Sequence, residues 1–175
     1  MRYRRARVTG ATYFFTVNLA QRKSDLLTAH IKRLHDSIGL VRSRHPFEIP
    51  AMVVLPDHLH ALWVLPPDDA DFATRWALIE AGFSRGLLVH EPISASRQHK
   101  GERGIWQRRY WEHVIRDDED YARHVDYIHY NPVKHRYVTG AADWPHSSIH
   151  RYIDEGILPV DWAGGSRDDK ATFGE

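Results

Sequence analysis

Two histidines spaced two residues apart, His58 and His60, are the residues of this sequence best suited to chemistry. They lie in the apolar run 52–65, which is typical of β-strands. Side chains repeat every second residue along a strand, so both imidazoles would project from one face, with Leu59 on the other. Two neighbouring neutral imidazoles can bind a divalent metal ion. Because the chain contains 13 histidines, the pair alone is a weak signal and needs support from other residues.

That support comes from a helix predicted for residues 117–132. Four of its polar residues fall at i, i+4, i+7 and i+11 and therefore share one side of the helix, namely Asp120, His124, Tyr127 and Asn131. If this stripe faces the histidines, one pocket holds two imidazoles, an amide oxygen and a phenol. The first three make a metal site with open coordination positions, and the phenol is a candidate nucleophile.

The chemistry that such a pocket favours is attack on a DNA phosphodiester. The metal would polarise a phosphoryl oxygen, and Tyr127 would form a phosphotyrosine and release a 3′-hydroxyl. The phosphotyrosine retains the bond energy that is needed for rejoining. Tyrosine has a free pKa of about 10, so it needs a nearby cation to act as a nucleophile.

Each of these residues also has a structural interpretation. A tyrosine in an amphipathic helix usually packs against the core, and Asn131 before Pro132 fits a helix C-terminal residue. Asp120 fits an acid in the first helical turn, and His124 fits a surface or supporting residue. Packing in the core is the expected role of four tryptophans, Trp63, Trp76, Trp106 and Trp111.

Length, charge and composition narrow the classes of protein. A chain of 175 residues indicates a single domain with a sizeable core, and a net charge of +1 excludes a strong overall field for polyanions. The absence of cysteine excludes disulfides and cysteine–zinc sites. No apolar run has the length of a signal core or a membrane span, so we expect a cytoplasmic protein with no membrane partner.

Cations are concentrated in two segments of the sequence. The first has four arginines without an acid among them, Arg2, Arg4, Arg5 and Arg7. In the second, residues 107–111, Arg108 and Arg109 lie beside Tyr110 and Trp111. Arginines mixed with aromatic residues suit phosphate contacts and base stacking, so we predict that these arginines bind DNA. A solvated charged face is the alternative.

The order of the predicted elements indicates the fold class. Strands are expected at 12–19, 47–55, 58–65 and 110–116, and helices at 25–44, 71–88, 117–132 and 146–155. Residues 90–104 lack periodicity and are expected to form a loop. This order predicts an α+β sandwich of ferredoxin-like type, with helices on one face of a central antiparallel sheet.

At this point the sequence resembles a known family. Residues 53–60 (VVLPDHLH) resemble the metal-binding strand of the HUH single-tyrosine transposases. Residues 106–117 (WQRRYWEHVIRD) and 124–135 (HVDYIHYNPVKH) are similar to their branch associated with repetitive extragenic palindromes (REPs), the RAYT proteins. Residues 3–5 and 13–19 are similar to the N-terminus of that branch, and residues 143–145 and 159–164 to its C-terminal extension.

The resemblance implies a fold, a site and a substrate. It implies a ferredoxin-like domain over residues 1–145 and a C-terminal extension over 146–175, whose last residues we expect to be mobile. It implies His58 and His60 as metal ligands, Asn131 as a third ligand in a position where relatives often carry Gln, and Tyr127 as nucleophile. Asp57 occupies a position where an acid commonly precedes the motif, with no ligand role implied.

The function that follows is a metal-dependent endonuclease and strand-transferase for single-stranded DNA. It would use magnesium or manganese and act at REP hairpins as a monomer or homodimer, in a bacterial cytoplasm and associated with the nucleoid. Two alternatives remain open. One is a hairpin-binding protein without cleavage activity. The other is a metal phosphodiesterase that uses water and would form no covalent adduct with DNA.

Overall fold

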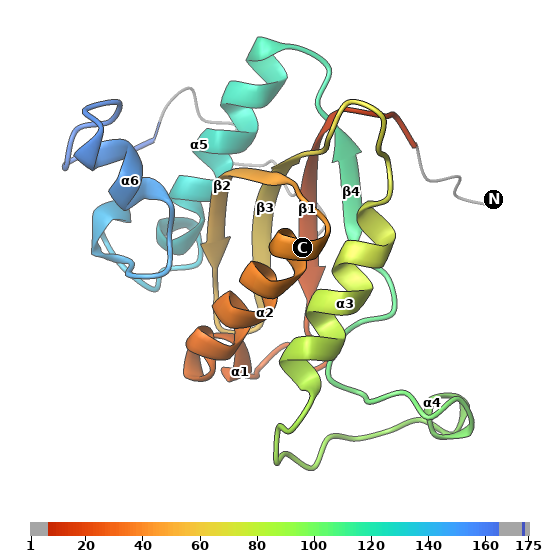
Figure 1. Ribbon diagram of the computed structural model, residues 1–175. Helices are drawn as coiled ribbons and strands as arrows, with labels where there is room; N and C mark the ends of the chain where they lie inside the picture. The colour runs from red at the N-terminus through yellow and green to blue at the C-terminus, as the bar shows by residue number, and fades with distance from the viewer. Residues whose placement is uncertain (1–6, 165–172, 174–175) are drawn as a thin grey trace.

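A four-stranded antiparallel sheet forms the centre of the protein (Figure 1). The computed structural model describes residues 7–164 and 173. The strands lie in the order β2-β3-β1-β4, and their bounds are β1 Thr12–Asn18, β2 Glu48–Val54, β3 His58–Val64 and β4 Trp111–Val114. A short turn at Pro56 and Asp57 joins β2 to β3, between the strands predicted at 47–55 and 58–65. The two histidines therefore lie in a central strand of the sheet.

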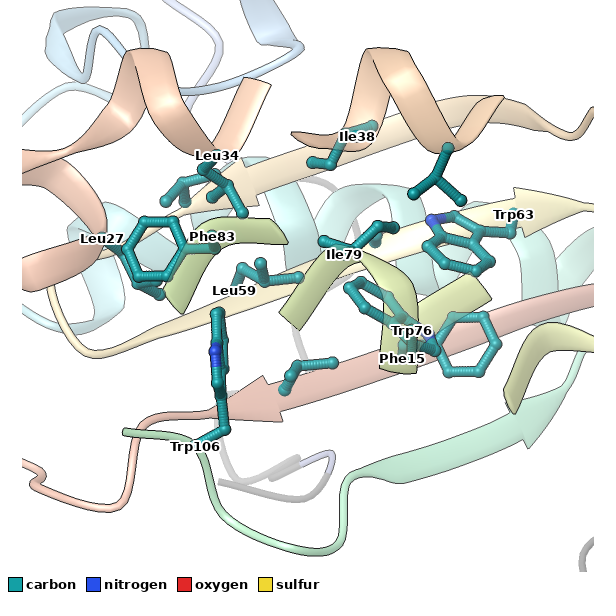
Figure 2. Close-up of a cluster of buried hydrophobic side chains, with 14 of the residues drawn as sticks. Phe15, Leu27, Leu34, Ile38, Leu59, Trp63, Trp76, Ile79, Phe83 and Trp106 are labelled. Atoms are coloured by element: carbon teal, nitrogen blue, oxygen red, sulfur yellow. The ribbon is translucent and has the colours of Figure 1, made fainter. Parts of the chain in front are cut away.

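Two long helices cover one face of the sheet, α2 (Ile31–Arg44) and α3 (Phe72–Ser84). Their apolar residues and alternate strand residues form the larger core, in which the rings of Trp63 and Trp76 stack 4.2 Å apart (Figure 2). Trp106 is buried as well, so three of the four tryptophans assigned to the core lie there. This arrangement of β1, α2, β2, β3, α3 and β4 is the predicted ferredoxin-like order.

A third long helix, α5 (Asp118–Lys134), lies on the opposite face of the sheet (Figure 1). The expectation that helices lie on one face is therefore correct for α2 and α3 and wrong for α5. The cause is visible in the strands: Phe14 and Leu62 alternate with residues of the larger core and face the other way. They bury their side chains with Val125 and Ile128 of α5 in a second cluster.

Several helix bounds differ from the sequence-based prediction. The helix expected at 25–44 is divided at His30 into α1 (Leu26–Ala29) and α2, and α3 ends at Ser84, before an extended Arg85. The segment expected to be a loop contains α4 (Ala95–His99). Helix α5 continues two residues past Pro132, because a proline near a helix end removes one hydrogen bond without preventing the last turn.

The C-terminal part covers the free edge of β2. It contains η1 (Ala141–Asp143) and α6 (Ile149–Asp154). Ser147 forms a bridge with Val53, and the neighbouring backbone nitrogen of Ser148 donates to the carbonyl of Met52 at 2.8 Å, which protects an edge strand from other pairing. The division at residues 145 and 146 stays a prediction, and the last residues, expected to be mobile, largely lie outside the described ones. Within the described chain, every helix is too short or too polar to cross a membrane.

Candidate active site

His58 and His60 lie side by side on the α5 face of β3. Both side chains are almost fully buried, and their ring centroids are 5.0 Å apart. The sheet register pairs His58 with Asn18 and His60 with Thr16 of β1. The period of two along a strand therefore brings both imidazoles to one face, as expected from the sequence.

Both imidazoles are held by a hydrogen bond from the Nδ1 atom. His58 donates from Nδ1 to Oδ1 of Asp57 at 2.6 Å. His60 Nδ1 lies 2.8 Å from Oγ1 of Thr16, whose hydroxyl donates to the carbonyl of Phe173, so the hydroxyl oxygen accepts from the imidazole. With the proton on Nδ1, each ring presents Nε2 as its lone-pair atom. The Nε2 of His58 is buried and has no hydrogen-bond partner within the described part of the chain.

Asp57 is a residue whose role sequence reasoning missed. Burial raises the pKa of its carboxyl group, but the hydrogen bond from His58 and the charge of Arg22 hold that pKa below its usual value. Arg22 lies 3.2 Å from the second carboxylate oxygen. A carboxylate that fixes a histidine by its Nδ1 is the usual second partner of a metal-binding imidazole. Its position directly before His58 was the available signal.

Tyr127 of α5 lies over the histidine pair. Its ring centroid is 5.2 Å from that of His60 in the same protomer, which confirms the expected meeting of the strand face and the helix stripe. Its phenol oxygen accepts a hydrogen bond from Nζ of Lys134 at 3.1 Å, and the same ammonium lies 4.7 Å from the ring centroid. Phe173 packs against the Tyr127 ring, with the centroids 4.7 Å apart.

Lys134 places an ammonium group beside the phenol oxygen of Tyr127, the kind of cation that a tyrosine nucleophile would need. Lys134 was not predicted as a site residue, although it falls at i+14 from Asp120 and therefore continues the polar stripe of α5. An ammonium group stabilises negative charge that develops on the phenol oxygen. The signal was thus present in the spacing.

Asn131 and His135 complete the helix side of the pocket. Asn131, one turn after Tyr127, is fully buried. His135 follows the end of α5, and its ring centroid is 5.0 Å from that of His58. His135 was not singled out from the sequence, although it lies one further turn along the same side.

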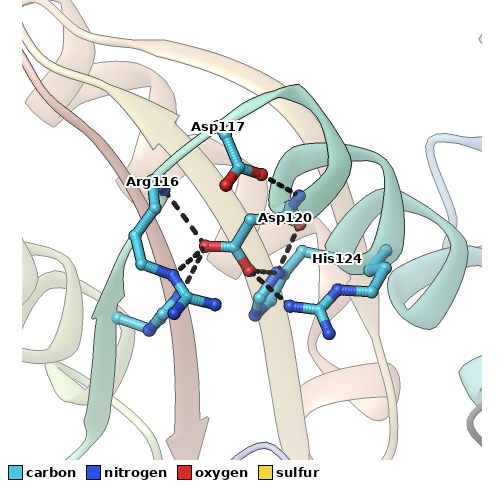
Figure 3. Close-up of polar contacts among 6 residues, drawn as sticks. Arg116, Asp117, Asp120 and His124 are labelled. Carbon is cyan, nitrogen blue, oxygen red and sulfur yellow. Dashed lines mark hydrogen bonds and ion pairs between the residues drawn. The ribbon is translucent and has the colours of Figure 1, made fainter.

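A second group of ionisable residues lies at the start of α5 (Figure 3). His113, Asp120 and His124 each offer one ligand atom, all within 4.8 Å of one another, so this group could hold a metal ion. The carboxylate of Asp120 is, however, already bound by the side chains of Arg116 and Arg123. Two guanidinium groups disfavour a cation on the same oxygens, so we interpret the group as an ion-pair network.

The structure decides between the expectations for two residues of this network. Asp120 lies in the first turn of α5, as expected. His124 was expected to be a surface or supporting residue, and the surface role is wrong because it is 1% exposed. Burial raises the pKa of Asp120, but hydrogen bonds from His113 and Arg116 outweigh it and lower that pKa. Burial lowers the pKa of His124, whose Nδ1 lies 2.7 Å from the backbone oxygen of Asp120. The neutral imidazole therefore donates from Nδ1.

The predicted DNA-binding arginines lie in different places. Arg108 and Arg109 are exposed at the end of the sheet where Asn18 pairs with His58. Arg108 binds Glu102 at 2.9 Å, whereas Arg109 forms no hydrogen bond or ion pair in the described chain. Arg7 is exposed at the opposite end, beside the acidic segment 66–71. Three further candidates, Arg2, Arg4 and Arg5, lie outside the described residues.

The chain is similar in sequence and structure to several known proteins. No family model matches the chain. A REP-associated tyrosine transposase of Escherichia coli strain K12 is 46% identical over 166 residues, which is 95% of this chain and 93% of the relative. A relative in Haemophilus influenzae is 45% identical over 163 residues, 93% of either chain. A REP-associated tyrosine transposase solved in complex with a REP hairpin superposes with a TM-score of 0.85 at 44% identity, covering 100% of this chain and 97% of that one.

Proposed function

Since this chain belongs to the family of REP-associated tyrosine transposases, we propose that it binds REP-type hairpins and nicks and rejoins single-stranded DNA beside them. In this proposal Tyr127 is the nucleophile, and His58, His60 and Asn131 are metal ligands. The DNA is held by two groups of arginines, one with Arg108 and Arg109 and the other at the N-terminus with Arg2, Arg4, Arg5 and Arg7. Its setting is chromosomal DNA in a bacterial cytoplasm.

One observation carries the proposal: the imidazole pair, the phenol and an ammonium group meet within one protomer. His60 and Tyr127 are in ring contact, and Lys134 binds the phenol oxygen at 3.1 Å. A tyrosine that only packs would need neither a buried imidazole pair on the facing strand nor a cation on its oxygen. The site needs no residue from a second copy, so a monomer is sufficient for cleavage.

The chemical step follows from these contacts. The phenol oxygen of Tyr127 forms a bond to phosphorus, and the bond from phosphorus to the 3′-oxygen breaks. The phenol loses its proton and the departing 3′-oxygen takes one up, so the products are a 5′-phosphotyrosine and a 3′-hydroxyl. Lys134 holds the phenol oxygen in position and stabilises the charge that develops on it. Rejoining is the reverse reaction, with a 3′-hydroxyl as attacking group.

The donor set fits a divalent metal. Nε2 of His58 is a buried lone-pair atom without a hydrogen-bond partner among the described residues, and Asp57 and Thr16 fix the two rings. With the oxygen of Asn131, these residues would hold magnesium or manganese, and the two imidazoles favour manganese. When bound, the metal supplies Lewis-acid stabilisation of charge on the phosphoryl oxygens.

The test is the Tyr127→Phe variant on an oligonucleotide that contains a REP-type hairpin with single-stranded flanks. The change removes one hydroxyl and keeps the ring, so the fold should persist with a stability change within about 1–2 kcal/mol. Cleavage should vanish in the presence of manganese or magnesium. The wild-type protein should give a protein–DNA adduct that resists denaturing electrophoresis. Tyr121→Phe is the matched control, because Tyr121 lies on the same helix but packs against the second apolar cluster, and it should cut normally.

Other outcomes would point to the alternative functions. Cutting by the Tyr127→Phe protein would contradict the assignment of the nucleophile. Cutting by the wild type without an adduct would indicate the phosphodiesterase that uses water. Tight hairpin binding without cleavage under any metal condition would indicate a binding protein.

A further inference from the structure

Trp111 is an exception among the tryptophans assigned to the core. It opens β4 and is 41% exposed, whereas Trp63, Trp76 and Trp106 are all less than one tenth exposed. The expectation that it packs in the core is therefore wrong. Single exposed apolar side chains are common on protein surfaces, so a role for Trp111 has to be argued from where the ring lies.

The register of the sheet places Trp111 in line with the candidate active site. Trp111 pairs with Thr16, and Thr16 pairs with His60, so the three residues form one row across β4, β1 and β3. Directly paired residues of antiparallel strands point to the same face, and Thr16 contacts His60 by its side chain. Trp111 therefore lies on the face of the histidines, about 10 Å from His60 at two strand spacings.

The residues on either side of Trp111 support this orientation. Tyr110 packs against Phe15 and Trp76, which belong to the opposite face. His113, two residues after Trp111, binds Asp120 of α5 at 2.7 Å and so points to the α5 face. Alternation along the strand then puts Trp111 on the α5 face as well.

The exposure of Trp111 follows from the path of α5. The helix begins near the far end of β4, where His113 meets Asp120, and crosses toward β2 and η1. It leaves uncovered the corner of the sheet where β4 begins. Next to this corner, two residues before Trp111, lies Arg109, which is exposed and has no ion pair or hydrogen bond in the described chain.

We propose that Trp111 is the stacking platform for a base of the single-stranded DNA that flanks the scissile phosphate, and that Arg109 contacts the phosphate of that nucleotide. An exposed aromatic ring beside an unpaired arginine is the chemistry by which proteins bind single strands. Trp111 lies in the same row of the sheet as His60, so a base stacked on Trp111 would lie beside the proposed cleavage site. This inference rests on the proposed function and adds to it a base subsite.

An abasic scan combined with substitution tests the platform. The affinity of the full chain is measured, in a chelator that prevents cleavage, for a labelled REP-type hairpin oligonucleotide whose flanking bases are replaced one at a time by abasic sites. At one position the abasic site should weaken wild-type binding by about tenfold to a hundredfold. Trp111→Ala should weaken binding of intact DNA by a similar factor and become insensitive to the abasic site at that position.

Two variants control the measurement. Trp111→Phe keeps an aromatic face and should retain most of the affinity and the sensitivity to the same abasic site. Leu40→Ala removes a side chain that is 54% exposed on α2, on the other face of the sheet, and should behave as wild type. Circular dichroism shows whether each variant is folded. If Trp111→Ala is not folded, the comparison of the wild type with Trp111→Phe in the abasic scan tests the platform.

The outcomes separate this inference from the proposed function. Three results would overturn the platform. Trp111→Ala could bind as tightly as the wild type, or the wild type could be unaffected by every abasic site. The third result is that the affinity losses from Trp111→Ala and from the abasic site are independent, and so multiply, at every position. In all three cases the wild type can still form its adduct at Tyr127 in manganese. Loss of that adduct in the wild type would instead overturn the proposed function.

Discussion

The two faces of the central sheet differ in chemistry: one packs into an apolar core and the other carries the candidate active site. On the α2 and α3 side, β1 and β3 present Phe15 and Trp63 to an apolar, aromatic core. On the α5 side, neighbouring positions of the same strands present Thr16 and His60, buried to the same degree but polar. Alternation along a strand thus lets one sheet carry a stabilising core and a reactive site, and substitutions on the two faces should have separable effects.

The largest expected effect belongs to the reactive face. His58→Ala should lower the rate of DNA cleavage by about a thousandfold or more, because the metal acts on charge in the transition state. Hairpin affinity should change little, since it comes mostly from phosphate contacts elsewhere. The free energy of unfolding should change by less than about 2 kcal/mol. Cleavage, binding and urea unfolding are measured on the same preparation.

Equal losses of binding and cleavage in His58→Ala would indicate a structural metal. Mixing His58→Ala with Tyr127→Phe gives a further check. If each protomer contains a complete site, the mixture should remain inactive, and recovery of cleavage would show that the site is shared between two copies.

The apolar face should show the converse behaviour. Trp76→Ala removes a fully buried ring that stacks on Trp63, and it should lower the free energy of unfolding by about 3–5 kcal/mol. At temperatures where the variant stays folded, cleavage should continue near the wild-type rate. A folded Trp76→Ala protein without activity would mean that the two faces are not separable.

The contact between α5 and the C-terminal part should make stability depend on pH. Burial lowers the pKa of His129 to about 4, and its Nε2 lies 2.9 Å from Oγ of Ser148. In the unfolded chain this residue has a pKa of about 6.5, so below that pH the unfolded chain binds more protons than the folded chain. The free energy of unfolding is therefore highest above pH 6.5 and falls toward pH 4. The loss should be on the order of 3 kcal/mol at most. Urea unfolding at several pH values measures it.

His129→Gln provides the control for this dependence. Glutamine retains a hydrogen-bonding group without a titrating ring, so the slope between pH 6.5 and pH 4 should become shallower. An unchanged slope would assign the dependence to other groups, of which His124 is the first candidate because burial also lowers its pKa.

The smallest effect in this series is expected for Lys134→Ala. Loss of a charged hydrogen bond to the phenol oxygen should slow cleavage by about tenfold to a hundredfold and leave hairpin affinity unchanged. Lys134→Arg keeps the charge and should recover part of the rate. An equal fall in affinity and rate, without recovery by arginine, would show that Lys134 binds DNA and does not assist Tyr127.

Local periodicity was enough to group His58 with His60 and to place Tyr127 on a polar helix stripe, whereas the meeting of the two groups was expected only on condition that the stripe faces the histidines. A period of two fixes the histidines on one strand face, and a period near 3.6 collects the polar stripe of α5. The same stripe contained Lys134, which was overlooked. The ferredoxin-like order of strands and helices also followed from pattern alone.

Other features depend on contacts between distant segments and left no local signal. The burial of His124 arises where the start of α5 meets His113 of β4. The exposure of Trp111 arises because α5 crosses the sheet obliquely. The side of the sheet that α5 occupies depends on Phe14 and Leu62, whose facing was ambiguous in a strand that is apolar on both faces.

The most direct test of the account is the identity of the residue that becomes linked to DNA. Wild-type protein is incubated with manganese and a REP-type hairpin oligonucleotide with single-stranded flanks, digested with protease, and the nucleotide-bearing peptide is sequenced by mass spectrometry. The account predicts a single adduct at Tyr127, joined through a 5′-phosphate and absent from His58→Ala. An adduct at Tyr130 or another residue, or cleavage with no adduct, would contradict it.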